Sequence, residues 1–282
     1  MKYHWRNLNI HDTESLNQAQ DMVHQAVQFI SMVGRQLIDQ EEDDSNTNME
    51  WLEKQNTLAG HFVNGIIRVG FCYDDFSLNV INTSDEAVRS KPLDGLSMKA
   101  VFSWLKMELI MNGALAQDLE LKLHYKIPSH PVNQGDAFKK PDQDVLNELA
   151  CHRHNAHEAL KAYSEDGEYA GDVATWPHHF DTGVYIPIEK DEDDNALKSF
   201  SMGYAIADDI IDEPYLYVTQ WAETGKLNYS DKPELEHGIW HPGGLAGAAL
   251  PFCELAKADN QKECVDHFLS VTKKWSYEAE II

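Results

Sequence analysis

Gly65-Ile-Ile-Arg-Val-Gly-Phe-Cys-Tyr73 is followed, after Asp74-Asp75, by Phe76-Ser-Leu-Asn-Val-Ile81. Both runs are rich in β-branched and aromatic side chains, which favour strands. The two aspartates between them are typical of a turn, because their short side chains tolerate turn conformations of the backbone. The sequence therefore predicts a β-hairpin at this place.

Helices are expected on both sides of the hairpin. Apolar residues recur every three or four positions, as in amphipathic helices, at about residues 14–39, 97–111 and 142–163, with shorter helices at about 251–258 and 261–275. Further strands are expected at 120–127, 176–188, 199–206 and 215–221. This mixture predicts an α+β fold, with helices packed on an antiparallel or mixed sheet.

We expect a single domain over residues 1–282, because a chain of this length with 43% hydrophobic residues can bury a full core. Each half of the chain also runs in the order helix, acidic linker, tryptophan, strands, helix. That order leaves open two pseudo-repeated halves, residues 1–140 and 141–282, with Trp51 and Trp176 in equivalent places.

The charge of the chain limits its partners. The chain has 47 Asp and Glu and 23 Lys and Arg. Its formal net charge of -24 repels nucleic acids and anionic membranes, so neither is expected as a partner.

The first ten residues lack the apolar run of a signal peptide, which predicts a cytoplasmic location. The four cysteines show no C-x-x-C spacing and are expected to be free thiols.

Familiar catalytic signatures are missing from the sequence, among them the phosphate-binding loop, the dinucleotide fingerprint, the nucleophile elbow and H-E-x-x-H. Asp208-Asp-Ile-Ile-Asp212 matches a magnesium-binding D-D-x-x-D pattern, but Pro214 and a strand follow at once, so we expect a loop. The glycine-rich run Gly243–Gly247 could bind an anion, although close backbone packing explains these glycines equally well.

The third predicted helix carries the run His152-Arg-His-Asn-Ala-His-Glu158. Steps of 100° per residue place Arg153 within the apolar face and His157 at its edge. A buried guanidinium needs an anionic partner, and we predict Asp181 or Asp208. The alternatives are an Arg153 that reaches solvent along its aliphatic stem and a His157 that is only a half-buried, hydrogen-bonded side chain.

A candidate metal site lies in the strand expected from Trp176. Alternation places His179 and Asp181 on the same face, where an imidazole and a carboxylate can converge on one divalent metal ion. A third ligand must come from elsewhere in the chain, with His157, Asp208 and His241 as candidates. A structural hydrogen bond between His179 and Asp181 is the alternative.

Four segments resemble a bacterial family of uncharacterised proteins of unknown function. They are Trp176-Pro-His-His-Phe-Asp181, Gly203 to Asp208, Glu213-Pro-Tyr-Leu-Tyr-Val218 with Trp221, and Gly247-Ala-Ala-Leu-Pro-Phe252. The similarity covers about the last hundred residues and implies a family without naming an activity. It maps His179, Asp181 and Asp208 onto polar positions of the family pattern, whereas His178 departs from an acidic position.

We therefore expect a pocket for a small molecule or a divalent metal ion, with hydrolysis by a metal-bound water as an extension, lined by Trp176, Arg153, Asp208, Tyr215 and Tyr217. The competing hypothesis is a non-catalytic binding or assembly module. In that case the Trp- and Tyr-rich motifs form the core and a contact between copies in a homo-oligomer.

Overall fold

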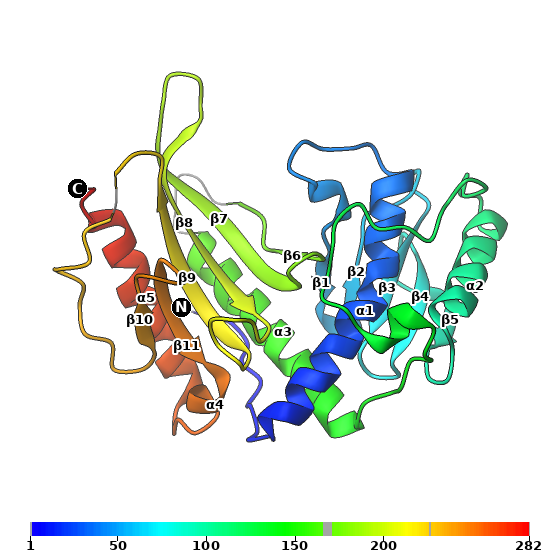
Figure 1. Cartoon of the computed structure of the whole chain (residues 1–282), viewed down its shortest axis with the longest axis horizontal. Coiled ribbons are helices and arrows are strands. Elements are labelled where there is room, and N and C mark those ends of the chain that lie inside the picture. Colours follow the sequence, from blue (N-terminus) through cyan, green and yellow to red (C-terminus); the bar gives the residue numbers. More distant parts are fainter. Residues whose placement is uncertain (1, 166–170, 226, 282) are drawn as a thin grey trace. The chain divides into compact units, whose positions relative to one another are not determined.

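The computed structural model of the chain describes residues 2–165, 171–225 and 227–281. The chain divides into two compact units. The N-terminal unit comprises Glu14–Ala150 and Ala174–Phe180, and the C-terminal unit comprises Met1–Thr13, Cys151–Val173 and Asp181–Ile282. Both combine helices with antiparallel strands (Figure 1), which confirms the predicted α+β class.

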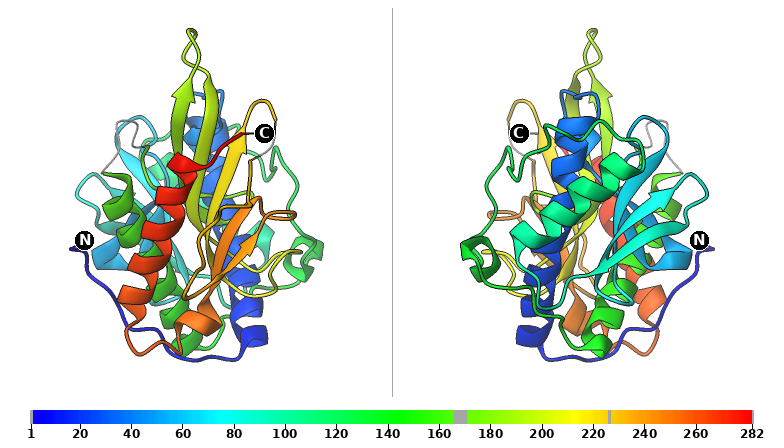
Figure 2. Two further views of the ribbon diagram at one scale, coloured as in Figure 1. Left: turned by 90° about the vertical axis from the view of Figure 1, so that its left-hand side faces the viewer. Right: turned by 90° about the vertical axis from the view of Figure 1, so that its right-hand side faces the viewer.

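The sheet of the N-terminal unit is a meander in which each strand pairs with the next. Its strands are β1 (Glu50–Leu52), β2 (Thr57–Ala59), β3 (Ile67–Cys72), β4 (Ser77–Asn82) and β5 (Ala87–Pro92). The predicted hairpin is the β3–β4 pair, in which Val69 lies opposite Val80. The helices α1 (Thr13–Leu37) and α2 (Met98–Met111) complete this unit (Figure 2, right) with short 3-10 turns at Ser45–Thr47, Glu53–Gln55 and Pro131–Gln134.

The strand predicted at 120–127 is wrong, since this segment runs as an irregular loop. Side chains of α1 take the place of a partner strand. Gln36 exchanges two hydrogen bonds of 2.9 Å with the backbone N and O of Glu120. The Tyr125 hydroxyl lies 2.7 Å from both Gln28 Oε1 and Ser31 Oγ. The alternating residues of this segment are therefore held by side chains of α1 and not by a ladder of backbone hydrogen bonds.

The sheet of the C-terminal unit includes the neighbouring strands β10 (Ile239–His241), β11 (Gly247–Pro251), β9 (Tyr215–Ala222), β8 (Ala196–Ala205) and β7 (Asp181–Lys190), in that spatial order. The helices of this unit are the part of α3 (Gln143–Ser164) from Cys151 onward, α4 (Phe252–Leu255) and α5 (Gln261–Glu278). Figure 2 (left) shows α5 against the strands. Buried Val184, Met202 and Val218 of the strands form one core cluster with Leu160 of α3 and Phe268 of α5.

The continuous strand predicted from Trp176 to Ile188 is also wrong. β6 (Ala174–Trp176) ends before a turn at residues 177–180, and β7 begins after that turn. The turn is held by α1, because His24 Nε2 and Gln28 Nε2 both lie 2.9 Å from the Pro177 carbonyl oxygen. Phe180 has a left-handed backbone (φ 55°) and stacks on the His24 ring at 5.1 Å. This break removes the basis for placing His179 and Asp181 on one strand face.

Among the described residues, each helix is either too short or too polar to cross a bilayer.

Gly247, in the glycine-rich run before Pro251, has a structural role. Gly247 begins β11, and a side chain at this position would overlap the Val218 carbonyl of β9. Close backbone packing, one of the two interpretations of this glycine, is what the structure shows.

Candidate functional site

The C-terminal sheet has a second face that carries several of the predicted site residues. Side chains alternate along a strand, so the neighbours of the core residues Val184, Met202 and Val218 point away from the core cluster. We call this second face the outer face. It carries Asp181, Gly183 and Tyr185 on β7, Ser199, Ser201 and Gly203 on β8, and Tyr215, Tyr217, Thr219 and Trp221 on β9.

Tyr217 lies across two glycines of the outer face. Gly203 pairs with Tyr217 in one ladder and with Gly183 in the other. A Cβ at Gly203 would overlap the Tyr217 ring, and a Cβ at Gly183 would lie 2.9 Å from its hydroxyl. The absent side chains leave room for the ring to cross β8, and its hydroxyl donates a 2.7 Å hydrogen bond to Asp181 Oδ2.

Asp208 organises the loop that leads into β9. Its Oδ1 accepts hydrogen bonds from the backbone N–H groups of Ile210 (2.7 Å) and Ile211 (3.0 Å). Its Oδ2 accepts a 2.7 Å hydrogen bond from the Tyr215 hydroxyl. The carboxylate therefore holds a loop, as predicted for Asp208–Asp212, and three donors already occupy it.

Both tyrosine hydroxyls are kept in the neutral form. Burial and the hydrogen bond to Asp208 raise the pKa of Tyr215. Burial and the nearby charge of Asp181 raise the pKa of Tyr217 well above its usual value. A phenol that donates to a carboxylate is stabilised with its proton in place, so these two groups act as hydrogen-bond donors and not as bases.

An open hollow of about 440 Å³ lies further along the outer face. Two aromatic side chains stand half-exposed beside it, Tyr185 at 51% and Trp221 at 50%. Ser201 pairs with Tyr185 across one ladder and with Thr219 across the other. The lining consists of Tyr185, Ala196, Ser199, Phe200, Ser201, Thr219 and Trp221. The volume is within the range of small-ligand sites, and no lining residue is charged.

The polar groups of this hollow are uncommitted. Within the described parts of the chain, the hydroxyls of Ser201 and Thr219 make no hydrogen bond, and neither does the indole N–H of Trp221. Hydroxyls both donate and accept hydrogen bonds, and an exposed ring offers a face for stacking. This part of the outer face can therefore bind a molecule that has both a flat face and a polar edge.

Arg153 lies on the core side of the same unit. The residue is 1% exposed, so its predicted burial is confirmed and the solvent-reaching alternative is wrong. Its Nη1 donates a 2.8 Å hydrogen bond to Thr182 Oγ1, and its Cζ lies 4.8 Å from the centre of the Tyr204 ring. The carboxylates proposed for it, Asp181 and Asp208, accept hydrogen bonds from Tyr217 and Tyr215 on the outer face.

The predicted metal ligands are spread over the chain. Asp181 is on β7 and His241 on β10, with β8, β9 and β11 between them. Neighbouring strands lie about 4.8 Å apart, so four steps separate these side chains by roughly 19 Å, too far to share one ion. His157 is half-buried on α3, while exposed His179 and half-buried Trp176 belong to the N-terminal unit.

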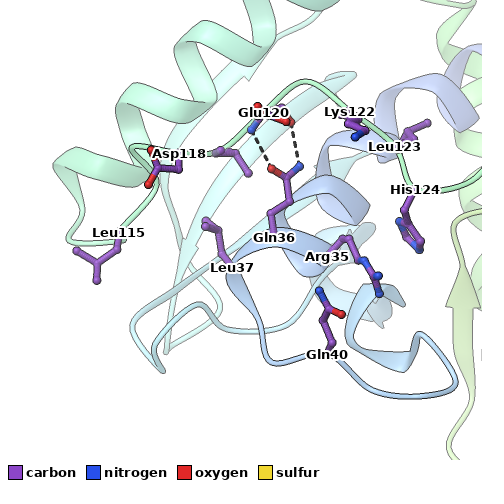
Figure 3. Close-up of a pocket in the computed structure, with 11 residues that line it drawn as sticks. Arg35, Gln36, Leu37, Gln40, Leu115, Asp118, Glu120, Lys122, Leu123 and His124 are labelled. Carbon is purple, nitrogen blue, oxygen red and sulfur yellow. Dashed lines mark hydrogen bonds between the residues drawn. The ribbon is translucent and has the colours of Figure 1, made fainter.

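The N-terminal unit has a hollow of its own, of about 530 Å³ (Figure 3). Three of its polar side chains, Arg35, Gln36 and His124, are bonded to neighbours. Gln36 uses both its amide N and O on the Glu120 backbone, Arg35 pairs with Asp44 at 3.0 Å, and His124 Nε2 lies 3.3 Å from the other oxygen of the same carboxylate. The lining comprises Arg35, Gln36, Leu37, Gln40, Leu115, Asp118, Leu119, Glu120, Lys122, Leu123 and His124.

No known protein family, curated protein or solved structure matches the chain. The resemblance to an uncharacterised bacterial family therefore stays a prediction. Of the predicted residues, Asp181, Tyr215 and Tyr217 come together on the outer face, with Asp208 bonded to Tyr215. Sequence patterns did not predict the hollow on the outer face, because only the strand register shows that the residues that line it are neighbours.

Proposed function

We propose that the chain binds a small, neutral, polyhydroxylated ring compound of the saccharide class in the hollow on the outer face. The observation that carries this proposal is the pair of half-exposed rings, Tyr185 and Trp221, beside the uncommitted hydroxyls of Ser201 and Thr219. An aromatic ring can stack on the apolar face of a sugar, while side-chain hydroxyls pair with its edge.

The electrostatics favour a neutral ligand. The seven residues of the lining carry no charge that could pair with an ionic group. The formal net charge of -24 also creates a field that repels anions such as phosphorylated compounds. An uncharged ligand meets neither obstacle.

The proposed activity is binding and not hydrolysis. A hydrolytic site needs an acid, a base or an activated nucleophile within hydrogen-bond reach of the reacting atom, and the lining holds no carboxylate, imidazole, amine or thiol. Asp181 is four residues from Tyr185 along β7, about 13 Å at the rise of an extended strand. The carboxylate therefore lies outside the hollow.

The test is a titration of tag-free protein with a panel of neutral mono- and oligosaccharides, followed by calorimetry and tryptophan fluorescence. Trp221→Ala and Tyr185→Ala are each expected to weaken binding at least tenfold. Lys122→Ala, in the hollow of the N-terminal unit, is the control and should leave the affinity unchanged. Failure of the whole panel to bind, or binding that survives Trp221→Ala, would overturn the proposal.

A second candidate, an assembly module, is favoured by the apolar groups on the same face. Ile239 of β10 is 47% exposed and pairs with Ala249, which in turn pairs with Tyr217, so it shares the outer face with Trp221. Exposed apolar side chains grouped on one face are typical of contacts between proteins. Sedimentation velocity would support this candidate by showing a dimer that Trp221→Glu dissociates, and a monomer at all concentrations would exclude it.

A further inference from the structure

The N-terminal arm, residues 4–8, is held by two side-chain amides of the C-terminal unit. Asn155 of α3 accepts from the Arg6 backbone N–H (2.8 Å) and donates to the Arg6 carbonyl (2.7 Å). Gln261 of α5 does the same at Leu8, at 2.8 and 2.9 Å. Each amide satisfies both backbone groups of one arm residue, as a neighbouring strand would, so the arm has a defined position.

This arm brings His4 against a buried histidine of α3. His4 Nδ1 lies 3.2 Å from His154 Nε2, and the two rings meet edge to face with their centres 5.4 Å apart. His154 is fully buried, and it directly precedes the clamping residue Asn155. His4 is exposed and stands two residues before Arg6. The hydrogen bonds between Asn155 and Arg6 therefore limit the movement of His4 relative to His154.

The distance between the two nitrogens suits a metal ion. In tetrahedral zinc sites with bonds of 2.0–2.1 Å to histidine, two ligand nitrogens lie about 3.3 Å apart. Imidazole nitrogens are preferred ligands of zinc, copper and nickel. The negative field of the chain raises the local concentration of such cations.

We propose that His4 and His154 are two ligands of a transition-metal site of the zinc class, with water or further groups completing the shell. The ion takes the place of the proton that one imidazole otherwise shares with the other. It ties the N-terminal arm to α3, so that metal binding stabilises the docked arm. This site is independent of the hollow on the outer face and of the metal ligands predicted at His179 and His241.

The test is calorimetry of tag-free, metal-stripped protein with zinc chloride. We expect one zinc ion per chain, an affinity that weakens toward acid pH because protons compete for the nitrogens, and a melting temperature that rises with zinc. His4→Ala and His154→Gln should each lower the affinity at least tenfold. His179→Ala and His241→Ala are matched controls that should leave it unchanged.

A simple hydrogen bond between the rings is the competing explanation. It predicts no saturable zinc binding, or binding that His4→Ala does not weaken, and either result would overturn the metal site. Should His154→Gln fail to fold, the exposed His4 still decides the question, because its truncation leaves the buried residue in place. Trp221→Ala should not change zinc affinity, so failure of the saccharide proposal and failure of this one remain distinguishable.

Discussion

Each unit of the protein has a hollow of similar size, and some of the polar side chains that line the two hollows differ in whether they are already bonded. In the N-terminal unit, Gln36 is bonded to the backbone of Glu120, and Arg35 and His124 both meet Asp44. On the outer face of the C-terminal unit, Ser201 and Thr219 have uncommitted hydroxyls. A hydrogen-bonded group must give up that bond before it can bind a ligand. A buried partner left without a hydrogen bond costs about 1–3 kcal/mol of free energy. Volume alone therefore does not identify the better site.

The outer face should tolerate change least where Tyr217 crosses the glycines. Gly203→Ala places a Cβ inside the Tyr217 ring, which must move and leave Asp181 without its hydroxyl donor. We expect a loss of roughly 1–3 kcal/mol in the free energy of unfolding, measured by urea denaturation.

Gly243→Ala is the matched control for this glycine. An added Cβ at Gly243 meets nothing within 4 Å, so its effect should stay within about 0.5 kcal/mol. Equal midpoints for the two variants would show that the ring is not seated over Gly203.

The next largest effect concerns ligand affinity. Trp221→Ala removes one half-exposed ring of the outer-face hollow, and we expect affinity for the bound saccharide to fall at least tenfold, about 1.4 kcal/mol. The melting temperature should hardly change, because the side chain is half in solvent. Leu115→Ala removes an exposed apolar group from the other hollow and should leave the affinity intact. Equal losses in both variants would erase the distinction between the two hollows.

Alkaline pH should weaken the C-terminal unit through its tyrosines. The pKa values of Tyr215 and Tyr217 are raised above the ordinary value of 10.0, so both stay protonated in the folded state while the unfolded chain releases its protons. Their contribution to stability is complete below about pH 10 and declines as pH rises above it, by up to about 1.4 kcal/mol per pH unit for each tyrosine. Urea midpoints measured from about pH 9 to 11 should fall, and Tyr217→Phe should flatten that slope. An unaltered slope in Tyr217→Phe would contradict this assignment.

The smallest effect is expected at the rim of the N-terminal hollow. Arg35→Ala removes the pair with Asp44, whose side chains are 31% and 44% exposed. Solvent screens such pairs, so we expect less than about 1 kcal/mol of lost stability, and less again at high salt. A larger loss that salt does not reduce would mean that the bonded polar groups of this hollow are a structural centre of the unit.

Local patterns predicted most of the helices but placed strands less well. The spacing of Val23, Val27 and Ile30 is a property of one helix, and α1 forms where it was predicted. The segment around Tyr125 alternates like a strand yet bonds to α1, because an alternating pattern fits any surface with an apolar side. β11 was missed, since its small residues lack strand character and Gly247 is there to let two backbones approach.

The candidate site was predicted only in part, because local patterns do not show which residues of different strands come together. Tyr215 and Tyr217 stood out because they are aromatic residues two positions apart within one strand. Their partners Asp181 and Gly203 come from strands that sequence distance does not connect, and the pairing of His179 with Asp181 failed at the turn anchored by His24.

The sequence by itself determined the α+β class, the β3–β4 hairpin, the four long helices and the acidic charge, because each depends on residue type and on spacing within one segment. The tertiary structure decided which side chains share the outer face, which arm residue meets His154, and which polar groups stay unbonded. These are contacts between residues far apart in the chain. They arise from strand register and helix packing, which depend on all the surfaces that must be buried together.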